Sequence, residues 1–179
     1  MLVYGVPSYK LEKDVVAAEI DIIKAMGVEI KTGVEVGKDI TIDELRKQGY
    51  KAFYVAIGCQ GGKKAGVPGE DATGVTTAVD FLREVSEKES YNLEGDVVVI
   101  GGGNVAIDAA RCGGRVGDYK VTMFCLEDKE HMPASIEEIE EAEEENIAIN
   151  CGWGPKEILT ENGKVTGVVF KKCVSVTDA

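Results

Sequence analysis

The chain has no long hydrophobic run, although 44% of its 179 residues are apolar. It contains no stretch of about 18 or more consecutive apolar residues, so the sequence predicts no membrane-spanning helix. The opening segment MLVYGVPSYK has neither a basic region nor an apolar core, and it does not have the pattern of a signal peptide. We therefore expect a cytoplasmic protein without a membrane partner, large enough to bury a core in one domain or two small ones.

Basic residues are scarce relative to acidic ones. The 20 lysines and arginines are outnumbered by 32 aspartates and glutamates, which gives a net charge of −12. A chain this acidic repels the phosphate groups of DNA and RNA. Nucleic acid is therefore not an expected partner.

The cysteines are odd in number and include no C-x-x-C pair. This pattern argues against a disulfide framework, a zinc or iron–sulfur site and a redox-active dithiol. We expect reduced thiols, most of them buried, and no metal site. The five residues are Cys59, Cys112, Cys125, Cys151 and Cys173.

Common catalytic motifs are missing as well. The sequence has no P-loop lysine motif, no G-x-S-x-G and no H-E-x-x-H. The single histidine, His131, lies in the polar loop DKEHMPAS, where we expect it to be solvated rather than catalytic. Tyr9 and Lys13 have the Y-x-x-x-K spacing of short-chain dehydrogenases, but they precede the glycine-rich turn that such a pair should follow, so we interpret the match as chance.

The first half of the chain shows helical and strand patterns in alternation. The spacing of its apolar residues predicts a helix within 11–27, and a capping-box pattern at Thr41 and Glu44 predicts a second, short helix. Two further segments, 28–32 and 51–58, have strand patterns, and we expect the second strand to be buried. A third helix is expected at 77–87.

A polar and charged segment near Leu93 predicts a domain boundary. Beyond it we expect a strand at 97–100, a helix to about residue 116 and a strand at 120–126. The acidic side chains of a following helix at 136–146 are expected to form a solvated surface. The rest of the chain predicts short antiparallel strands, with Asn162-Gly163 as a hairpin turn.

The stretch VVVIGGGNVAIDAA places a glycine-rich turn between a strand and a helix. Its central residues fit the pattern G-x-G-x-x-G/A, in which the first glycine makes a tight turn and the second lets a pyrophosphate approach the backbone. The N-terminus of the helix offers N–H groups and the positive end of its dipole to the phosphates. The sequence therefore predicts a dinucleotide site at Gly101, Gly102, Gly103, Asn104, Val105 and Ala106.

Five segments together resemble one protein family, in order and over essentially the whole chain. They are MLVYGVPSYKLEKDVVAAEIDIIKAMGVEI, VGKDITIDEL, AIGCQGGKKAGVPGEDATGV, IGGGNVAIDAAR and HMPASIEEIEEA. The family is the small (beta) subunit of NADPH-dependent glutamate synthase and its relatives, which include the flavoprotein part of dihydropyrimidine dehydrogenase.

The resemblance implies an α/β fold, in which a Rossmann-like NAD(P)-binding domain is joined to a partial FAD-binding domain. Residues 1–93 would form the partial FAD domain and residues 94–179 the NAD(P) domain, without its last parallel strand. Hydride would pass from NAD(P)H to FAD and electrons onward to iron–sulfur clusters, which needs no dedicated acid or base. We therefore name no catalytic residue, and we expect Gly58 to lie near FAD.

The family carries a cysteine-rich iron–sulfur region and a first FAD turn before the point where this chain begins, and a closing FAD motif after its end. We therefore expect an internal, inactive fragment of a longer flavoprotein, which binds FAD only as part of that protein. A large partner subunit is implied for glutamate synthase itself. Two alternatives remain: a stand-alone dinucleotide-binding module with a regulatory or scaffolding role, and a small Rossmann reductase with its own substrate.

The end of the second Rossmann strand predicts which nicotinamide cofactor is preferred. Many members of the family end this strand with a tyrosine and two arginines, where this chain has Cys125, Leu126 and Glu127. An acid at this point accepts a hydrogen bond from the ribose 2′-OH of NAD, whereas an arginine accommodates the 2′-phosphate of NADP. Leu126 and Glu127 are therefore candidate cofactor contacts, and we expect NADH to be favoured over NADPH.

Gly113 and Gly114 are a second departure from the family, and we expect them to weaken the end of the helix that follows the glycine-rich turn.

Overall fold

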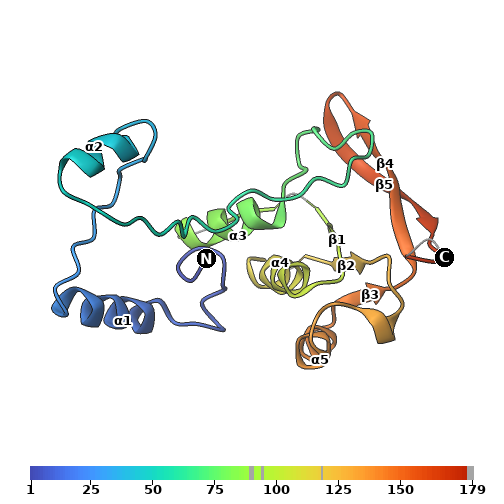
Figure 1. The fold of residues 1–179 in the computed structure, drawn as a ribbon. Coiled ribbons are helices and arrows are strands. Elements are labelled where there is room, and N and C mark those ends of the chain that lie inside the picture. Colours follow the sequence, from blue (N-terminus) through green and yellow to red (C-terminus); the bar gives the residue numbers. More distant parts are fainter. Residues whose placement is uncertain (89–90, 94, 118, 177–179) are drawn as a thin grey trace. The chain divides into compact units, whose positions relative to one another are not determined.

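A parallel sheet organises the C-terminal half of the computed structural model (Figure 1). Its strands β1 (Val97–Ile100), β2 (Val121–Phe124) and β3 (Ala148–Asn150) lie in the order β1-β2-β3. Helices α4 (Asn104–Arg115) and α5 (Ile136–Glu144) make the two crossovers. This is a Rossmann-like α/β arrangement, which confirms the predicted fold class.

The structure describes residues 1–88, 91–93, 95–117 and 119–176. It divides into two compact units, Met1–Lys10 with Gln60–Ala179 and Leu11–Cys59. Residue 94, next to the domain boundary expected near Leu93, lies outside the described residues. The boundary itself stays a prediction about the domains of a longer protein. In the described part of the chain, no helix is long and apolar enough to cross a membrane.

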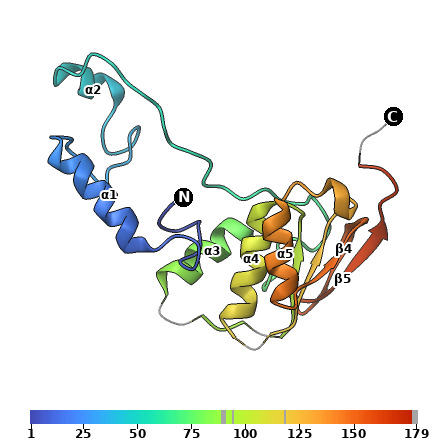
Figure 2. The same ribbon diagram turned by 90° about the horizontal axis from the view of Figure 1, so that it is seen from below.

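The main core lies between the parallel sheet and the two crossover helices, which lie side by side in Figure 2. The strands follow one another in the same direction across the sheet, and parallel crossover connections share one handedness. Both crossover helices therefore cover the same face of the sheet. Alternate residues of β2 point into this core, so Val121 and Met123 are buried while Thr122 and Phe124 are only partly so. Other core members include Ile107, Ala110, Ile139, Ala142 and Ile147.

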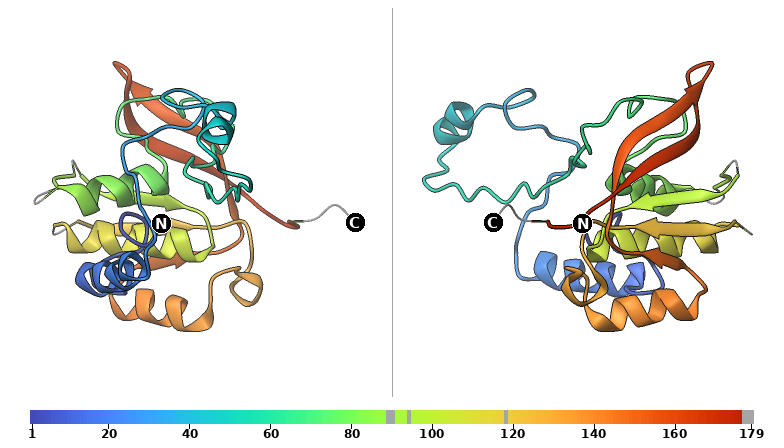
Figure 3. Two further views of the ribbon diagram at one scale, coloured as in Figure 1. Left: turned by 60° about the vertical axis from the view of Figure 1, so that its left-hand side comes forward. Right: turned by 90° about the vertical axis from the view of Figure 1, so that its right-hand side faces the viewer.

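An antiparallel hairpin of β4 (Trp153–Glu161) and β5 (Lys164–Lys172) follows the sheet, as Figure 3 shows. Its turn contains Asn162 and Gly163 at φ 52° and 78°, which confirms the predicted hairpin. The rings of Phe124 on β2 and Phe170 on β5 stack with centroids 3.9 Å apart, so the hairpin contacts the sheet face opposite the helices.

The strand β3 corrects one expectation. We predicted antiparallel strands for the whole C-terminal segment, but β3 pairs with β2 in parallel, with Thr122 opposite Ala148. A strand of three residues is too short to show a periodicity, and its direction is set by the α5 crossover that delivers it.

Helix α3 (Ala78–Glu87) packs on α4 and starts at Thr77, whose hydroxyl accepts the N–H of Asp80. This confirms the predicted helix at 77–87. Phe81 and Leu82 of α3 form a second buried cluster with residues of α4. The N-terminal segment also contacts α3, where the Ser86 hydroxyl donates a 3.2 Å hydrogen bond to the carbonyl of Tyr4.

The unit Leu11–Cys59 contains the helices α1 (Lys13–Ala25) and α2 (Ile42–Lys47), both as predicted. The capping box of Thr41 and Glu44 is present in full. The two predicted strands are wrong, because no strand is assigned at 28–32 or 51–58. Nor is the second segment buried, since Tyr54 is 93% exposed. Strands form only when a neighbour pairs with them, and the described bridges of this unit consist of the isolated pair Val36↔Ile40.

Two consecutive glycines near the end of α4 lead to a stability prediction. Gly114 is exposed and helical, and a Cβ added there would meet only Val121 Cγ2, at 3.9 Å. We expect Gly114→Ala to raise the free energy of unfolding by about 0.5–1 kcal/mol, because alanine loses less backbone entropy in a helix. Chemical denaturation followed by Trp153 fluorescence measures this. Gly163→Ala, at a positive φ, should destabilise the chain, and a loss of stability in Gly114→Ala would contradict the prediction.

Candidate dinucleotide-binding site

The first glycine of the turn lies where strand β1 ends and the chain reverses toward α4. Gly101 has φ 146° and donates its N–H to the carbonyl of Phe124 at 2.9 Å. A Cβ added to Gly101 would lie 3.2 Å from Cβ of Ala106, closer than ordinary contact. Small residues at both positions therefore allow the strand and the helix to approach each other closely.

The second glycine of the motif, Gly103, is the N-cap of α4. A Cβ added there would meet no atom within 4 Å, so the space above this residue is open. Having no side chain, Gly103 makes no cap hydrogen bond, and the first turn of α4 contains no acidic residue. The helix N-terminus is thus accessible to an anion.

The middle glycine, Gly102, packs against the segment after β2. Its carbonyl accepts the N–H of Ala134 at 3.0 Å. A Cβ on Gly102 would lie 2.9 Å from the carboxylate Oε2 of Glu127 and 3.0 Å from Cβ of Cys125. The structure therefore brings Glu127 directly beside the glycine-rich turn.

Leu126 and Glu127 follow the end of β2 at the position expected. The Leu126 side chain is 43% exposed. The carbonyl of Glu127 accepts a 2.8 Å hydrogen bond from the N–H of Gly152. The cationic residue nearest in sequence, Lys129, forms an ion pair with Glu143 at 2.6 Å. This segment thus presents an acid, and the lysine that follows it is engaged elsewhere.

The loop after Glu127 continues into a short 3₁₀ helix, Lys129–His131, in which the carboxylate of the N-cap residue Asp128 accepts the N–H of His131 at 3.0 Å. His131 is exposed, as expected, and its Nδ1 lies 2.7 Å from Asp128 Oδ1. That hydrogen bond raises the pKa of His131 and lowers the pKa of Asp128. His131 is thus engaged by Asp128, and we do not assign it to the site.

Asn104 connects the turn to the second crossover helix. Its Oδ1 accepts the N–H of Ser135, the N-cap of α5, at 2.9 Å. Val105, next along α4, is 50% exposed. Both residues belong to the predicted dinucleotide site, and their contact with a cofactor stays a prediction. The hydrogen bond of Asn104 links the N-termini of α4 and α5.

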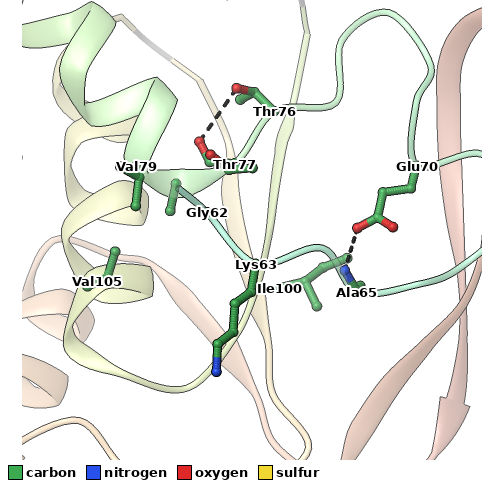
Figure 4. A pocket seen from close by; sticks show the side chains of 10 residues that line it. Gly62, Lys63, Ala65, Glu70, Thr76, Thr77, Val79, Ile100 and Val105 are labelled. Atoms are coloured by element: carbon green, nitrogen blue, oxygen red, sulfur yellow. Dashed lines mark hydrogen bonds between the residues drawn. The ribbon is translucent and has the colours of Figure 1, made fainter. Parts of the chain in front are cut away.

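A pocket of about 240 Å³ lies beside the turn and is lined by Ile100 and Val105 (Figure 4). The N-terminus of α3 and the loop that contains Lys63 form its other walls. The carboxylate of Glu70 is held by the N–H of Gly66 at 2.9 Å and also accepts from Ala65. Lys63 was missed by sequence reasoning, although its place in GGKKAG, a lysine pair between glycines, is a signal for a cation on an open loop.

Gly58, the candidate FAD contact, belongs to the unit Leu11–Cys59 and not to the unit that holds the turn. It has φ 66°, and a Cβ there would meet no atom within 4 Å. Its proximity to FAD remains a prediction.

The acidic face of α5 corrects a second expectation, because several of its carboxylates are not simply solvated. Arg111 of α4 is 6% exposed and binds Glu145 (Nε–Oε1 2.9 Å), Glu141 and, at 3.6 Å, Glu138. Glu138 also binds Lys10 from the N-terminal segment. The N–H of Glu138 donates to the hydroxyl of Ser135, the N-cap of α5, at 3.4 Å. Among the described residues, no cluster of three or more histidines, cysteines or acids is suited to a metal.

Acidification tests this network. Burial acts to raise the pKa of Glu145, but hydrogen bonds from Arg115 and Arg111 outweigh it and hold the pKa below its usual value. Stabilisation from a lowered pKa is present above the unfolded-state value, near 4.5, and is lost as the pH falls through the folded-state value. We therefore expect the denaturation midpoint to drop between about pH 6 and pH 3. Glu145→Gln should flatten that drop, and an unchanged pH profile in this variant would refute the assignment.

The sequence model of the pyridine nucleotide-disulphide oxidoreductase family matches residues 4–178. The chain belongs to this family. The resemblance to glutamate synthase small subunits is confirmed by 36% identity to the small chain of glutamate synthase [NADPH] from Escherichia coli, over 94% of this chain and 38% of that protein. The beta subunit of NADP(+)-dependent formate dehydrogenase from Moorella thermoacetica is 39% identical over 94% of this chain and 24% of its own length.

A solved structure with a similar fold is that of FprA from Mycobacterium tuberculosis (His57Gln mutant). It superposes with a TM-score of 0.78 at 18% identity, over 96% of this chain and 54% of that one. This chain thus spans about a quarter to two-fifths of the length of the two curated relatives.

Proposed function

We propose that the glycine-rich turn binds the pyrophosphate of NAD(P)H, and that the chain forms part of an FAD-dependent NAD(P)H oxidoreductase. The observation that carries this proposal is the open N-terminus of α4 at Gly103, directly after a parallel strand. Membership of the pyridine nucleotide-disulphide oxidoreductase family supports it. The space above Gly103 fits a phosphate group, which no side chain of the turn would obstruct.

The chain's own residues bind and orient the cofactor in this proposal. Gly103 and the first N–H groups of α4 hold the pyrophosphate, and Glu127 accepts a hydrogen bond from an adenosine ribose hydroxyl. Lys63 lines the same pocket as Val105 and adds a positive charge there. Bound nicotinamide supplies the hydride, and no side chain acts as an acid or base.

The whole protein would pass that hydride to FAD and single electrons to iron–sulfur centres. One relative is named NADPH-Fe(3+) oxidoreductase subunit beta, from Geobacter sulfurreducens, and others are subunits of formate dehydrogenase or glutamate synthase. FAD, with Gly58 near it, the iron–sulfur clusters and a large partner subunit belong to this proposal for the longer protein.

A preference for NADH over NADPH is the finer part of the proposal. The relatives' names give it no support, because those that specify a nucleotide name NADP(+) or NADPH. It rests on this chain's own residues: Glu127 stands beside the turn, and Lys129 is paired with Glu143. A 2′-phosphate would meet a like charge and no arginine.

Gly103→Ala tests the main proposal. Its φ of −95° suits alanine, and the added methyl group meets no protein atom within 4 Å, so the fold should persist. The methyl group would occupy the space that the pyrophosphate needs, and we expect about tenfold or greater loss of NADH affinity, measured by titration calorimetry. Gly114→Ala, in the same helix but distant from the turn, is the matched control. Unchanged affinity in Gly103→Ala would refute pyrophosphate binding at this turn.

A further inference from the structure

The parallel ladder of β2 and β3 continues past the strand ends and there pairs two cysteines. The N–H of Cys125 donates to the carbonyl of Asn150 at 3.0 Å, and the N–H of Trp153 donates to the carbonyl of Cys125 at 2.8 Å. This pattern places Cys125 opposite Cys151, with Gly152 as an extra residue at φ 77°. Opposed residues of neighbouring strands lie about 5 Å apart with side chains on one face, within the Cα separation of disulfides.

The two thiols differ in their surroundings. Cys125 is buried, and its Sγ lies 3.6 Å from the carbonyl oxygen of Glu127. Cys151 is partly exposed, with its Sγ 3.8 Å from Sδ of Met132. The pKa of Cys125 is raised to about 12. Burial is the larger cause, and a hydrogen bond with Cys151 is the next. Of these two thiols, Cys151 is therefore the one that a reagent in solution reaches first, and Cys125 stays protonated at neutral pH.

We propose that Cys125 and Cys151 are a redox-responsive pair, which a low-molecular-weight disulfide such as oxidised glutathione converts into an internal disulfide. The Cys151 thiolate attacks one glutathione sulfur, which breaks the glutathione S–S bond and releases one glutathione. Cys125 then loses its proton to water and attacks the Cys151 sulfur, which releases the second glutathione. Two electrons pass from the protein thiols to the glutathione disulfide, so the protein is oxidised and glutathione is reduced.

The cysteine pair lies next to the glycine-rich turn. Cβ of Cys125 lies directly under the glycine-rich turn, 3.0 Å from where Gly102 would carry a Cβ. A disulfide would join the carboxyl ends of β2 and β3 beside Gly102, and its formation needs no bound nucleotide. The formation of this disulfide can therefore be tested whether or not the turn binds a nucleotide.

Treatment of the folded 179-residue chain with oxidised glutathione tests the pair. After an acid quench, we expect the mass before alkylation to fall by about 2 Da relative to the reduced chain, and alkylation in denaturant should then label two fewer cysteines. Proteolysis should yield a linked pair of peptides containing Cys125 and Cys151, and dithiothreitol should reverse the change. The reaction should accelerate steeply from about pH 7 to about pH 9, because Cys125 must deprotonate.

Matched variants separate the two roles. Cys151→Ser should keep Cys125 in reduced form, whereas Cys125→Ser and Cys125→Ala should stop at a glutathione mixed disulfide on Cys151. Cys59→Ser, at an exposed cysteine, should react as the parent chain does. Trp153 fluorescence verifies that each variant is folded. Glutathione that persists on Cys151 in the parent chain, a disulfide between other cysteines, or five unreacted thiols would overturn the proposal.

Discussion

Replacing Leu126 and Glu127 together by arginine is expected to shift the cofactor preference from NADH toward NADPH. The carboxylate of Glu127 would repel a 2′-phosphate, whereas two arginines would bind it with charge-assisted hydrogen bonds. Each of these effects is worth about 1–3 kcal/mol, so the ratio of the two dissociation constants should change by about tens- to a thousandfold. Parallel titrations with NADH and NADPH at one ionic strength measure that ratio.

Leu126→Ala with Glu127→Gln is the control, because it removes the acid without supplying a cation. It should bind NADPH better than the parent chain does, but less well than the double-arginine variant. NADPH binding to the parent chain as tight as that of NADH would contradict the preference. An arginine variant with unchanged NADPH affinity would show that the 2′ position does not lie beside residues 126 and 127.

Arg111→Met is expected to lower the free energy of unfolding by about 2–4 kcal/mol. Arg111 is almost fully buried and binds carboxylates of α5, and its guanidinium lies 4.7 Å from the ring centre of Tyr9. Removing it leaves Glu141 and Glu145 close together without their shared cation, and truncating one partner of a buried ion network costs more than the network itself contributes. Urea denaturation followed by Trp153 fluorescence measures the loss.

Arg115→Met provides the matched control. Arg115 also binds Glu145 and lies over Tyr9, at 4.1 Å, but its side chain is 47% exposed. Exposed ion pairs contribute about 0–1 kcal/mol, so the loss in this variant should be several times smaller. Equal losses in the two variants would show that burial does not determine the contribution of Arg111.

The glycine-rich turn was predictable because its chemistry is local. The order of strand, glycines and helix within VVVIGGGNVAIDAA is written in consecutive residues, and β1 and α4 form where expected. The partners of the turn were not predictable in the same way. That Asn104 binds Ser135, and that Gly102 faces Glu127, depends on crossover connections that bring residues 25 or more positions apart into contact.

Burial was the weakest part of the sequence-based prediction. The apolar pattern at 51–58 predicted a buried strand, but strand pairing requires a neighbouring chain segment, which local pattern does not specify. The acidic run of α5 suggested a solvated face, because a window of sequence does not reveal that Arg111, on another helix, points at it.

The sequence by itself determined the helices with capping residues, the hairpin at Asn162-Gly163, the parallel βα unit with its glycine-rich turn, and the family of the protein. These features depend on residues close together in the chain, or on segments that keep their order. Only the tertiary structure decided the direction of β3, the open face of Gly103, the ion network of Arg111 and the pairing of Cys125 with Cys151. Each of these depends on which distant segments pack together, and packing acts between residues in space, with no regard to their separation in sequence.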